Sequence, residues 1–99
     1  MKKTFKLSHE KLNPDRHVDA IKHEVKKYIK RERRRKLPVD ADYWDFDCRF
    51  GAEELTSDDI HLSEINASID WAVSENLASF YLEIMARPGY RTKNSNQSE

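Results

Sequence analysis

The chain has 99 residues, 37% of them hydrophobic, and its 18 bases balance its 18 acids, so it suits one domain with a modest core and is not a globally basic nucleic-acid protein. No stretch approaches the roughly 20 apolar residues of a membrane span, and the opening MKKTFKLS precedes no apolar run of signal-peptide length. The single cysteine excludes an internal disulfide and fits a reducing compartment. Together with the lack of a membrane span and of a signal peptide, it predicts a cytoplasmic protein that does not contact membranes.

The N-terminal part predicts a short strand and a long helix. Residues 2–8 alternate between apolar and polar side chains, which is typical of a strand with one buried face. Asn13-Pro14-Asp15 predicts a helix start, because Asn caps a first turn and Pro at the first helical position loses no needed N–H donor. The helix should run to about Lys36, since Pro38 disfavours helical geometry in the residue before it.

Only part of this helix has an apolar side. Its stripe continues into the charged residues Glu32 and Lys36 after five apolar positions: Val18, Ile21, Val25, Tyr28 and Ile29. A helix of about 23 residues is roughly 35 Å long, whereas a strand of about six residues spans roughly 20 Å. We therefore expect the basic end of the helix to overhang its sheet and to project as a cationic prong.

The second half predicts two more strands and a second helix. Residues 43–52 alternate, with Trp44, Phe46, Cys48 and Phe50 on one side. The elements after them are an acidic loop over 53–60, a helix over about 64–76 that Ser63 caps, and a third strand over 79–87 that Pro88-Gly89 ends.

The element order is β-α-β-α-β, and each strand has one apolar face. We predict an α+β domain over residues 1–88, a two-layer sandwich whose three-stranded sheet carries both helices on one face, with a flexible tail over 89–99. Parallel crossovers would give the strand order 1-2-3, and the alternatives are a mixed sheet or a dimer that covers the open face. The expected core is Phe5, Leu7, Val18, Ile21, Val25, Trp44, Phe46, Phe50, Ile65, Ile69, Phe80, Leu82 and Ile84.

Charge is strongly segregated along the chain. Eight of the eleven residues 26–36 are Lys or Arg, whereas residues 40–59 carry eight acids and one base. The basic block favours a binding module that contacts the phosphates of RNA or DNA, with RNA favoured, or an acidic protein. No base-reading motif accompanies the block, so binding to a nucleic acid should depend little on its sequence. The alternative is a solvated surface, or one neutralised by Asp40 and Asp42. The binding residues would be Lys26, Lys27, Lys30, Arg31, Arg33, Arg34, Arg35 and Lys36.

Two other surfaces give alternative functions. Asp45, Asp47 and Glu83 should lie on the polar sheet face, where they could serve a small enzyme as an acid/base pair or a Mg²⁺ site, or simply pair with arginines across strands. Trp71 lies off the apolar stripe of the second helix. It marks a partner contact, in an adaptor or a homodimer, or packs against Tyr90 beneath the C-terminal segment.

Other ligand chemistry has little support. The four histidines, His9, His17, His23 and His61, lack a standard zinc spacing, and two glycines cannot form a glycine-rich phosphate loop. Cys48 should be a buried, inert thiol. We expect no metal and no cofactor, and a binding module rather than an enzyme.

Three stretches are similar to known sequences: VDAIKHEVKKYIKRERRRKLP (18–38), YWDFDCRFG (43–51) and SFYLEIMARPGYRTK (79–93). Together they resemble a family of small, uncharacterised bacterial proteins catalogued only as a domain of unknown function. The resemblance implies a bacterial, cytoplasmic protein and an intact domain. It implies no activity, ligand or catalytic residue.

Overall fold

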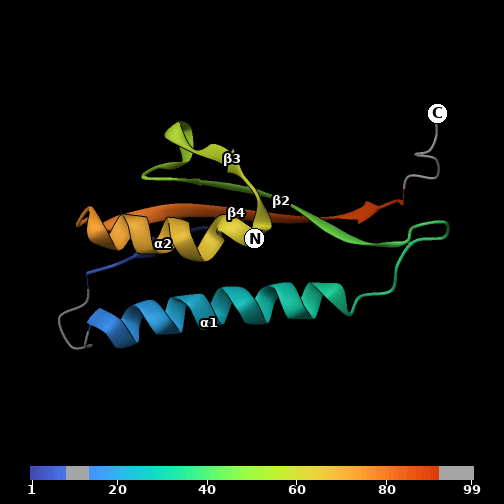
Figure 1. Ribbon diagram of the computed structural model, residues 1–99, viewed down its shortest axis with the longest axis horizontal. Coiled ribbons are helices and arrows are strands. Elements are labelled where there is room, and N and C mark those ends of the chain that lie inside the picture. Colours follow the sequence, from blue (N-terminus) through green and yellow to red (C-terminus); the bar gives the residue numbers. More distant parts are fainter. Residues whose placement is uncertain (9–13, 92–99) are drawn as a thin grey trace.

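An antiparallel sheet forms one layer of the domain and two helices form the other (Figure 1). The computed structural model describes residues 1–8 and 14–91. The predicted α+β, two-layer class is confirmed. In chain order the elements are β1 (Lys2–Lys6), α1 (Pro14–Arg33), β2 (Tyr43–Gly51), the 3-10 turn η1 (Glu54–Thr56), β3 (Asp58–Ile60), the 3-10 turn η2 (Leu62–Glu64), α2 (Ile65–Ser74) and β4 (Ser79–Gly89).

The sheet has four strands in the described part of the chain, not three, and its order is β1-β4-β2-β3. All three pairings are antiparallel, so the order 1-2-3 with parallel crossovers is wrong. An antiparallel sheet can leave one face in water, which a parallel sheet rarely does. The extra strand, β3, lies in the segment expected to be an acidic loop. It escaped prediction because its three residues, Asp58–Ile60, are too few to show alternation.

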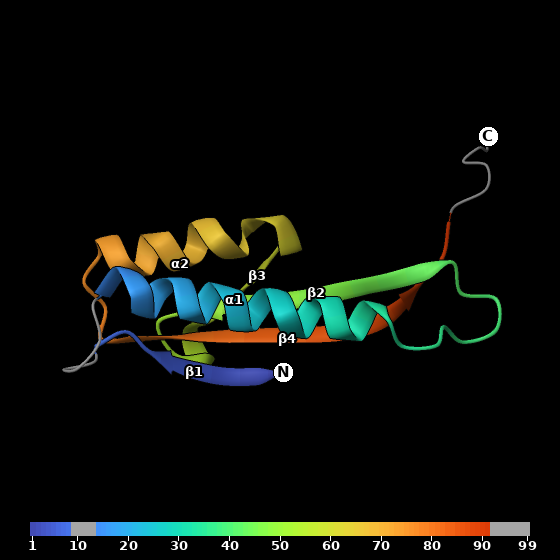
Figure 2. The same ribbon diagram turned by 90° about the horizontal axis from the view of Figure 1, so that it is seen from below.

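Both helices cover the same face of the sheet, as predicted (Figure 2). A salt bridge of 2.6 Å between Lys22 of α1 and Asp70 of α2 joins them. Phe80 is fully buried at the centre, with its ring stacked 5.3 Å from that of Phe5 and 5.2 Å from that of Phe50. Of the expected core, Leu7, Val18 and Trp44 are only partly buried; Cys48 and Ala72 join it instead.

Several predicted boundaries shift by a few residues. The helix α1 ends at Arg33 rather than near Lys36. Ser63 does not cap the second helix. A capping box lies at the preceding turn η2, where the ring Nδ1 of His61 accepts a hydrogen bond of 3.1 Å from the Ser63 N–H and Glu64 accepts one of 2.7 Å from the His61 N–H. The Asn13 cap lies outside the described residues, as does most of the expected tail, 92–99.

The strand β4 continues through Pro88-Gly89, which we expected to end it. Gly89 is buried and pairs with Tyr43, whose ring occupies the space that a side chain at position 89 would need. At 11 residues, β4 is roughly 36 Å long, which exceeds the roughly 30 Å of the 20-residue helix α1. The helix therefore does not overhang its sheet, and the expected cationic prong is wrong (Figure 2).

Candidate nucleic-acid interface

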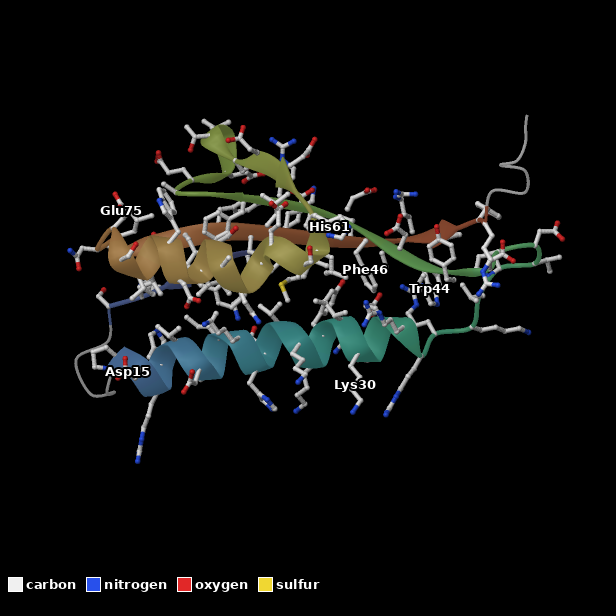
Figure 3. All side chains as sticks on the ribbon, viewed as in Figure 1. Asp15, Lys30, Trp44, Phe46, His61 and Glu75 are labelled. Atoms are coloured by element: carbon white, nitrogen blue, oxygen red, sulfur yellow. The ribbon has the colours of Figure 1, made fainter. Side chains whose placement is uncertain are left out.

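The eight cations expected to bind an anionic partner lie on the second half of α1 and on the turn after it. All eight are exposed, and the Lys30 side chain points away from the sheet (Figure 3). Together these side chains form the basic surface: Lys26, Lys27, Lys30, Arg31, Arg33, Arg34, Arg35 and Lys36. Because an α-helix turns every 3.6 residues, these side chains spread over its outer side.

Aromatic rings support three of the arginines. The guanidinium groups of Arg33 and Arg35 lie 5.5 and 5.2 Å from the ring centres of Phe46 and Trp44, respectively. The indole Nε1 of Trp44 also donates a hydrogen bond of 2.8 Å to the Arg35 carbonyl, which ties the turn after the helix to β2. A guanidinium stacked in this way keeps N–H groups at its edge available for an anion.

The sequence pattern predicts Trp44 and Phe46 as core residues and does not indicate their contacts with arginines. Tyr28 likewise supports Arg31, at 5.2 Å from its ring centre, and the spacing of three residues is a signal for a pair on one side of a helix. The contacts of Trp44 and Phe46 with the arginines depend on β2 lying beneath the end of α1. No local pattern carries that information.

Glu32 is the one carboxylate in the described part of the chain that forms an ion pair with the basic surface. Its oxygens lie 2.7 Å from Nη1 of Arg35 and 3.8 Å from Nε of Arg31. Asp40 and Asp42, the expected neutralising residues, form no such pair within residues 1–8 and 14–91. Within the same residues, six cations of the basic surface have no carboxylate partner: Lys26, Lys27, Lys30, Arg33, Arg34 and Lys36.

The carboxylates of β2 pair across the sheet rather than with α1. Arg87 of β4 lies 2.8 Å from Asp45 and 2.9 Å from Asp47. Its hydrogen bond with Asp47, and the charges of both aspartates, raise the pKa of Arg87 above its ordinary value. On β3, Asp59 lies 3.4 Å from Arg49. These three aspartates therefore form their ion pairs with arginines outside the basic surface.

The three carboxylates considered for catalysis are divided between two partners. Asp45 and Asp47 share Arg87, whereas Glu83 accepts a hydrogen bond of 2.7 Å from the phenol of Tyr81. This bond, with burial, raises the pKa of Tyr81 to about 12. Residues 1–8 and 14–91 contain no group of three or more His, Cys, Asp or Glu side chains that could hold a metal ion.

Tyr81 lies on the same strand as Glu83, β4, and is only 3% exposed. It lies opposite Gly51, at the end of β2, and the charges of Glu54 and Arg49 act on its phenol. Arg49 donates a hydrogen bond of 2.7 Å to the carbonyl of the buried Ser57. The turn that contains η1 thus closes over this end of the otherwise open face, which the sequence pattern alone does not indicate.

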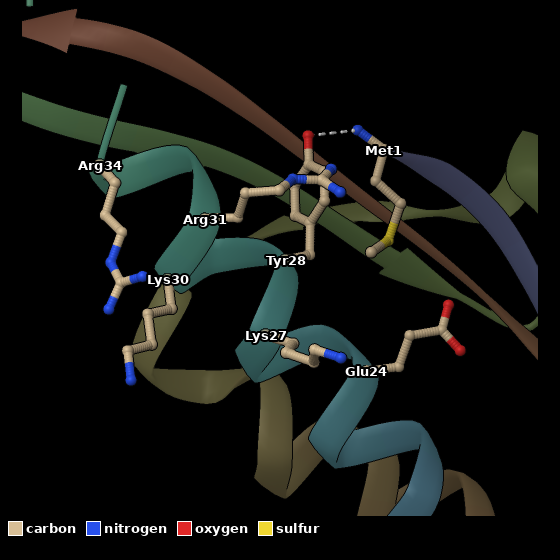
Figure 4. A pocket seen from close by; sticks show the side chains of 7 residues that line it. All are labelled: Met1, Glu24, Lys27, Tyr28, Lys30, Arg31 and Arg34. Atoms are coloured by element: carbon tan, nitrogen blue, oxygen red, sulfur yellow. Dashed lines mark hydrogen bonds between the residues drawn. The ribbon is translucent and has the colours of Figure 1, made fainter. Parts of the chain in front are cut away.

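A groove beside α1 collects several cations of the basic surface (Figure 4). It has a volume of about 810 Å³, and its lining contains one carboxylate, Glu24, which is paired with Lys3 at 2.7 Å. The amine of Met1 donates hydrogen bonds to the phenol of Tyr28, at 3.0 Å, and to a backbone carbonyl, and burial lowers the pKa of this amine. The lining residues are Met1, Glu24, Lys27, Tyr28, Lys30, Arg31 and Arg34.

A second groove, of about 640 Å³, runs between α1 and α2 on the other side of the basic surface. Val25 and Ile65 are among its apolar lining residues, and Lys26, Lys30 and Arg33 are among its cations. The basic surface is therefore a ridge between two grooves, and each groove is lined in part by its cations. An extended polyanion can follow such a ridge without entering a closed pocket.

Trp71 remains half exposed, and its ring centre lies 6.4 Å from that of Phe50 in a T-shaped arrangement. The predicted packing of Trp71 against Tyr90 is wrong. The neighbour of Trp71, Phe50, pairs with Leu82 near the start of β4, whereas Tyr90 follows the last residue of that strand. Trp71 lines a groove of about 450 Å³ between α2 and β3. Its partner role stays a prediction.

The fold and this surface define the class of protein: a small two-layer α+β domain with a cationic helix. The chain belongs to the family of unknown function DUF6172, whose family model matches residues 1–95, and the resemblance to an uncharacterised family is thereby confirmed. Neither the comparison with curated proteins nor that with solved structures gave a match. In the described part of the chain, no helix combines the length and apolar character that a membrane span requires.

Proposed function

We propose that this domain is a non-enzymatic module that binds the phosphate backbone of RNA through the basic surface. One observation carries the proposal: six exposed cations on and after one helix have no carboxylate partner among residues 1–8 and 14–91. An acidic protein is the alternative ligand for the same surface, and the test below includes it.

The length of the basic surface sets the number of phosphate contacts. The seven helical steps from Lys26 to Arg33 correspond to roughly 10 Å, and Arg34, Arg35 and Lys36 extend the basic surface beyond the helix, so one strand can contact about five cations. Each contact releases condensed counterions. For a single strand, log K should then fall against log salt with a slope near −3.5 (about 0.7 per contact).

Two features favour a flexible RNA strand over duplex DNA. The inner side of α1 packs on the sheet through the buried Ile21 and Val25, so only its outer side can meet a ligand. That helix, Pro14–Arg33, contains no Asn or Gln, the side chains that read adenine in a major groove. Binding should therefore depend little on base sequence, and a single strand can bend to follow the ridge and its grooves.

The experiment is a fluorescence anisotropy titration with labelled mixed-sequence single-stranded RNA, duplex DNA of equal length and polyglutamate, each over a range of salt concentrations. RNA should bind most tightly, with the slope given above. Tighter binding of polyglutamate would assign the surface to an acidic protein instead. Absence of RNA binding at about 0.01 M salt, where the Debye length is about 30 Å, would contradict the proposal.

A further inference from the structure

The groove beside Trp71 has apolar walls and an acidic rim. Phe50, Ile60, Ala67 and Trp71 contribute its apolar lining, and Asp58 of β3 lines it as well. Asp58 is exposed and forms no ion pair with a described residue. A half-exposed Trp in a groove is typical of an anchoring site in an interface. The charge of the rim selects a partner whose contacting segment is basic.

This chain itself carries a segment of that chemistry. The connection between α1 and β2 begins with Arg34, Arg35 and Lys36 of the basic surface and continues to Val39, which is 88% exposed. An exposed apolar side chain beside cations complements an apolar groove with a carboxylate on its rim. The net charge of zero means that the positive and negative surfaces of two copies can balance.

The two surfaces lie at opposite ends of the molecule. Figure 1 places α2 and β3 in one half of its long axis and the connection from α1 to β2 in the other. Two copies lying side by side in opposite directions bring each connection to the other copy's groove. The two contacts are then equivalent by a two-fold axis, so the assembly closes as a dimer rather than growing into a filament.

We infer that a second copy of this chain occupies the Trp71 groove, in an antiparallel dimer joined by two such contacts. Each contact inserts Val39 beside Trp71 and sets arginines of the basic surface against Asp58. The dimer covers part of the surface proposed to bind RNA. It would therefore compete with RNA, and this competition, unlike the dimer itself, rests on the proposed function.

Sedimentation velocity of the full chain, without RNA, tests the dimer. The weight-average mass should rise toward twice that of the monomer with concentration at about 0.1 M salt. It should fall back at about 1 M, where the Debye length drops from about 10 to about 3 Å. Trp71→Ser and Asp58→Lys should each raise the dissociation constant at least about tenfold. The control Val73→Ser removes another exposed apolar side chain of α2 and should change nothing.

Mixing two variants makes the test specific for reciprocal contacts. The first, Arg33→Glu with Arg34→Glu, keeps its groove but loses the basic segment. The second, Trp71→Ser with Asp58→Lys, keeps the basic segment but loses the groove. Each alone should be monomeric, and the mixture should form a heterodimer through the one intact contact.

Three results would overturn the dimer: a strict monomer at low salt and high concentration, association as tight in Trp71→Ser and Asp58→Lys as in the wild type, or no heterodimer in the mixture. None of them bears on RNA binding, which is measured separately. Conversely, a salt-sensitive dimer in a protein that binds no RNA would leave this inference intact and remove only the proposed function.

Discussion

Removing three cations of the basic surface should weaken RNA binding by a calculable amount. Lys27, Lys30 and Arg34 are exposed, line the groove of Figure 4 and form no ion pair with a described residue. Replacing all three by Ala removes about three of about five phosphate contacts. The slope of log K against log salt should fall from about −3.5 to about −1.4, and at 0.1 M salt the affinity should drop about 100-fold, or roughly 3 kcal/mol.

A matched control separates this surface from net charge. Lys2, Lys6 and Arg91 are also exposed, lie outside the basic surface, and their replacement by Ala lowers the net charge equally. Anisotropy titrations of wild type, triple variant and control, with one RNA at several salt concentrations, give the three slopes. The control should keep the wild-type slope.

The triple variant should remain folded, because none of its side chains is buried and Ala has the highest helix propensity. Removal of a positive charge near the C-terminus of an exposed helix such as α1 lowers the free energy of unfolding by about 0.3–1 kcal/mol. Urea unfolding checks this. Equal weakening of RNA binding in variant and control would refute the assignment of binding to the basic surface.

Three further predictions concern single residues. Glu32→Gln frees Arg31 and Arg35, so RNA affinity at 0.1 M salt should rise about fivefold, which is one added contact; unchanged affinity would contradict this. Burial and neighbouring aspartates raise the pKa of Cys48 to about 11, so the thiol stays protonated and should react far more slowly with a thiol reagent at about pH 8 than in the unfolded chain. Phe80→Ala should lower the free energy of unfolding, measured in urea, by about 3 to 5 kcal/mol, whereas a loss below about 1 kcal/mol would contradict its central place in the core.

Periodicity was enough to predict the two helices, three of the strands and the shared face on which both helices pack. It did not reveal that β4 lies between β1 and β2, because that order depends on contacts such as Phe5 with Phe80, between residues far apart in the chain. Composition alone identified the cations of the basic surface. Whether carboxylates neutralise them was not predictable, since the pairing of Asp45 and Asp47 with Arg87 is set by strand register.

Backbone amide shifts recorded while RNA is added test the central claim most directly. Isotope-labelled protein titrated with mixed-sequence single-stranded RNA should show its largest shifts in residues 26–36 and in the lining of the two adjacent grooves. The polar sheet face around Asp45 and Arg87 should change little. Shifts concentrated on that face would contradict the proposed surface. So would the absence of shifts at RNA concentrations well above the dissociation constant that anisotropy gives.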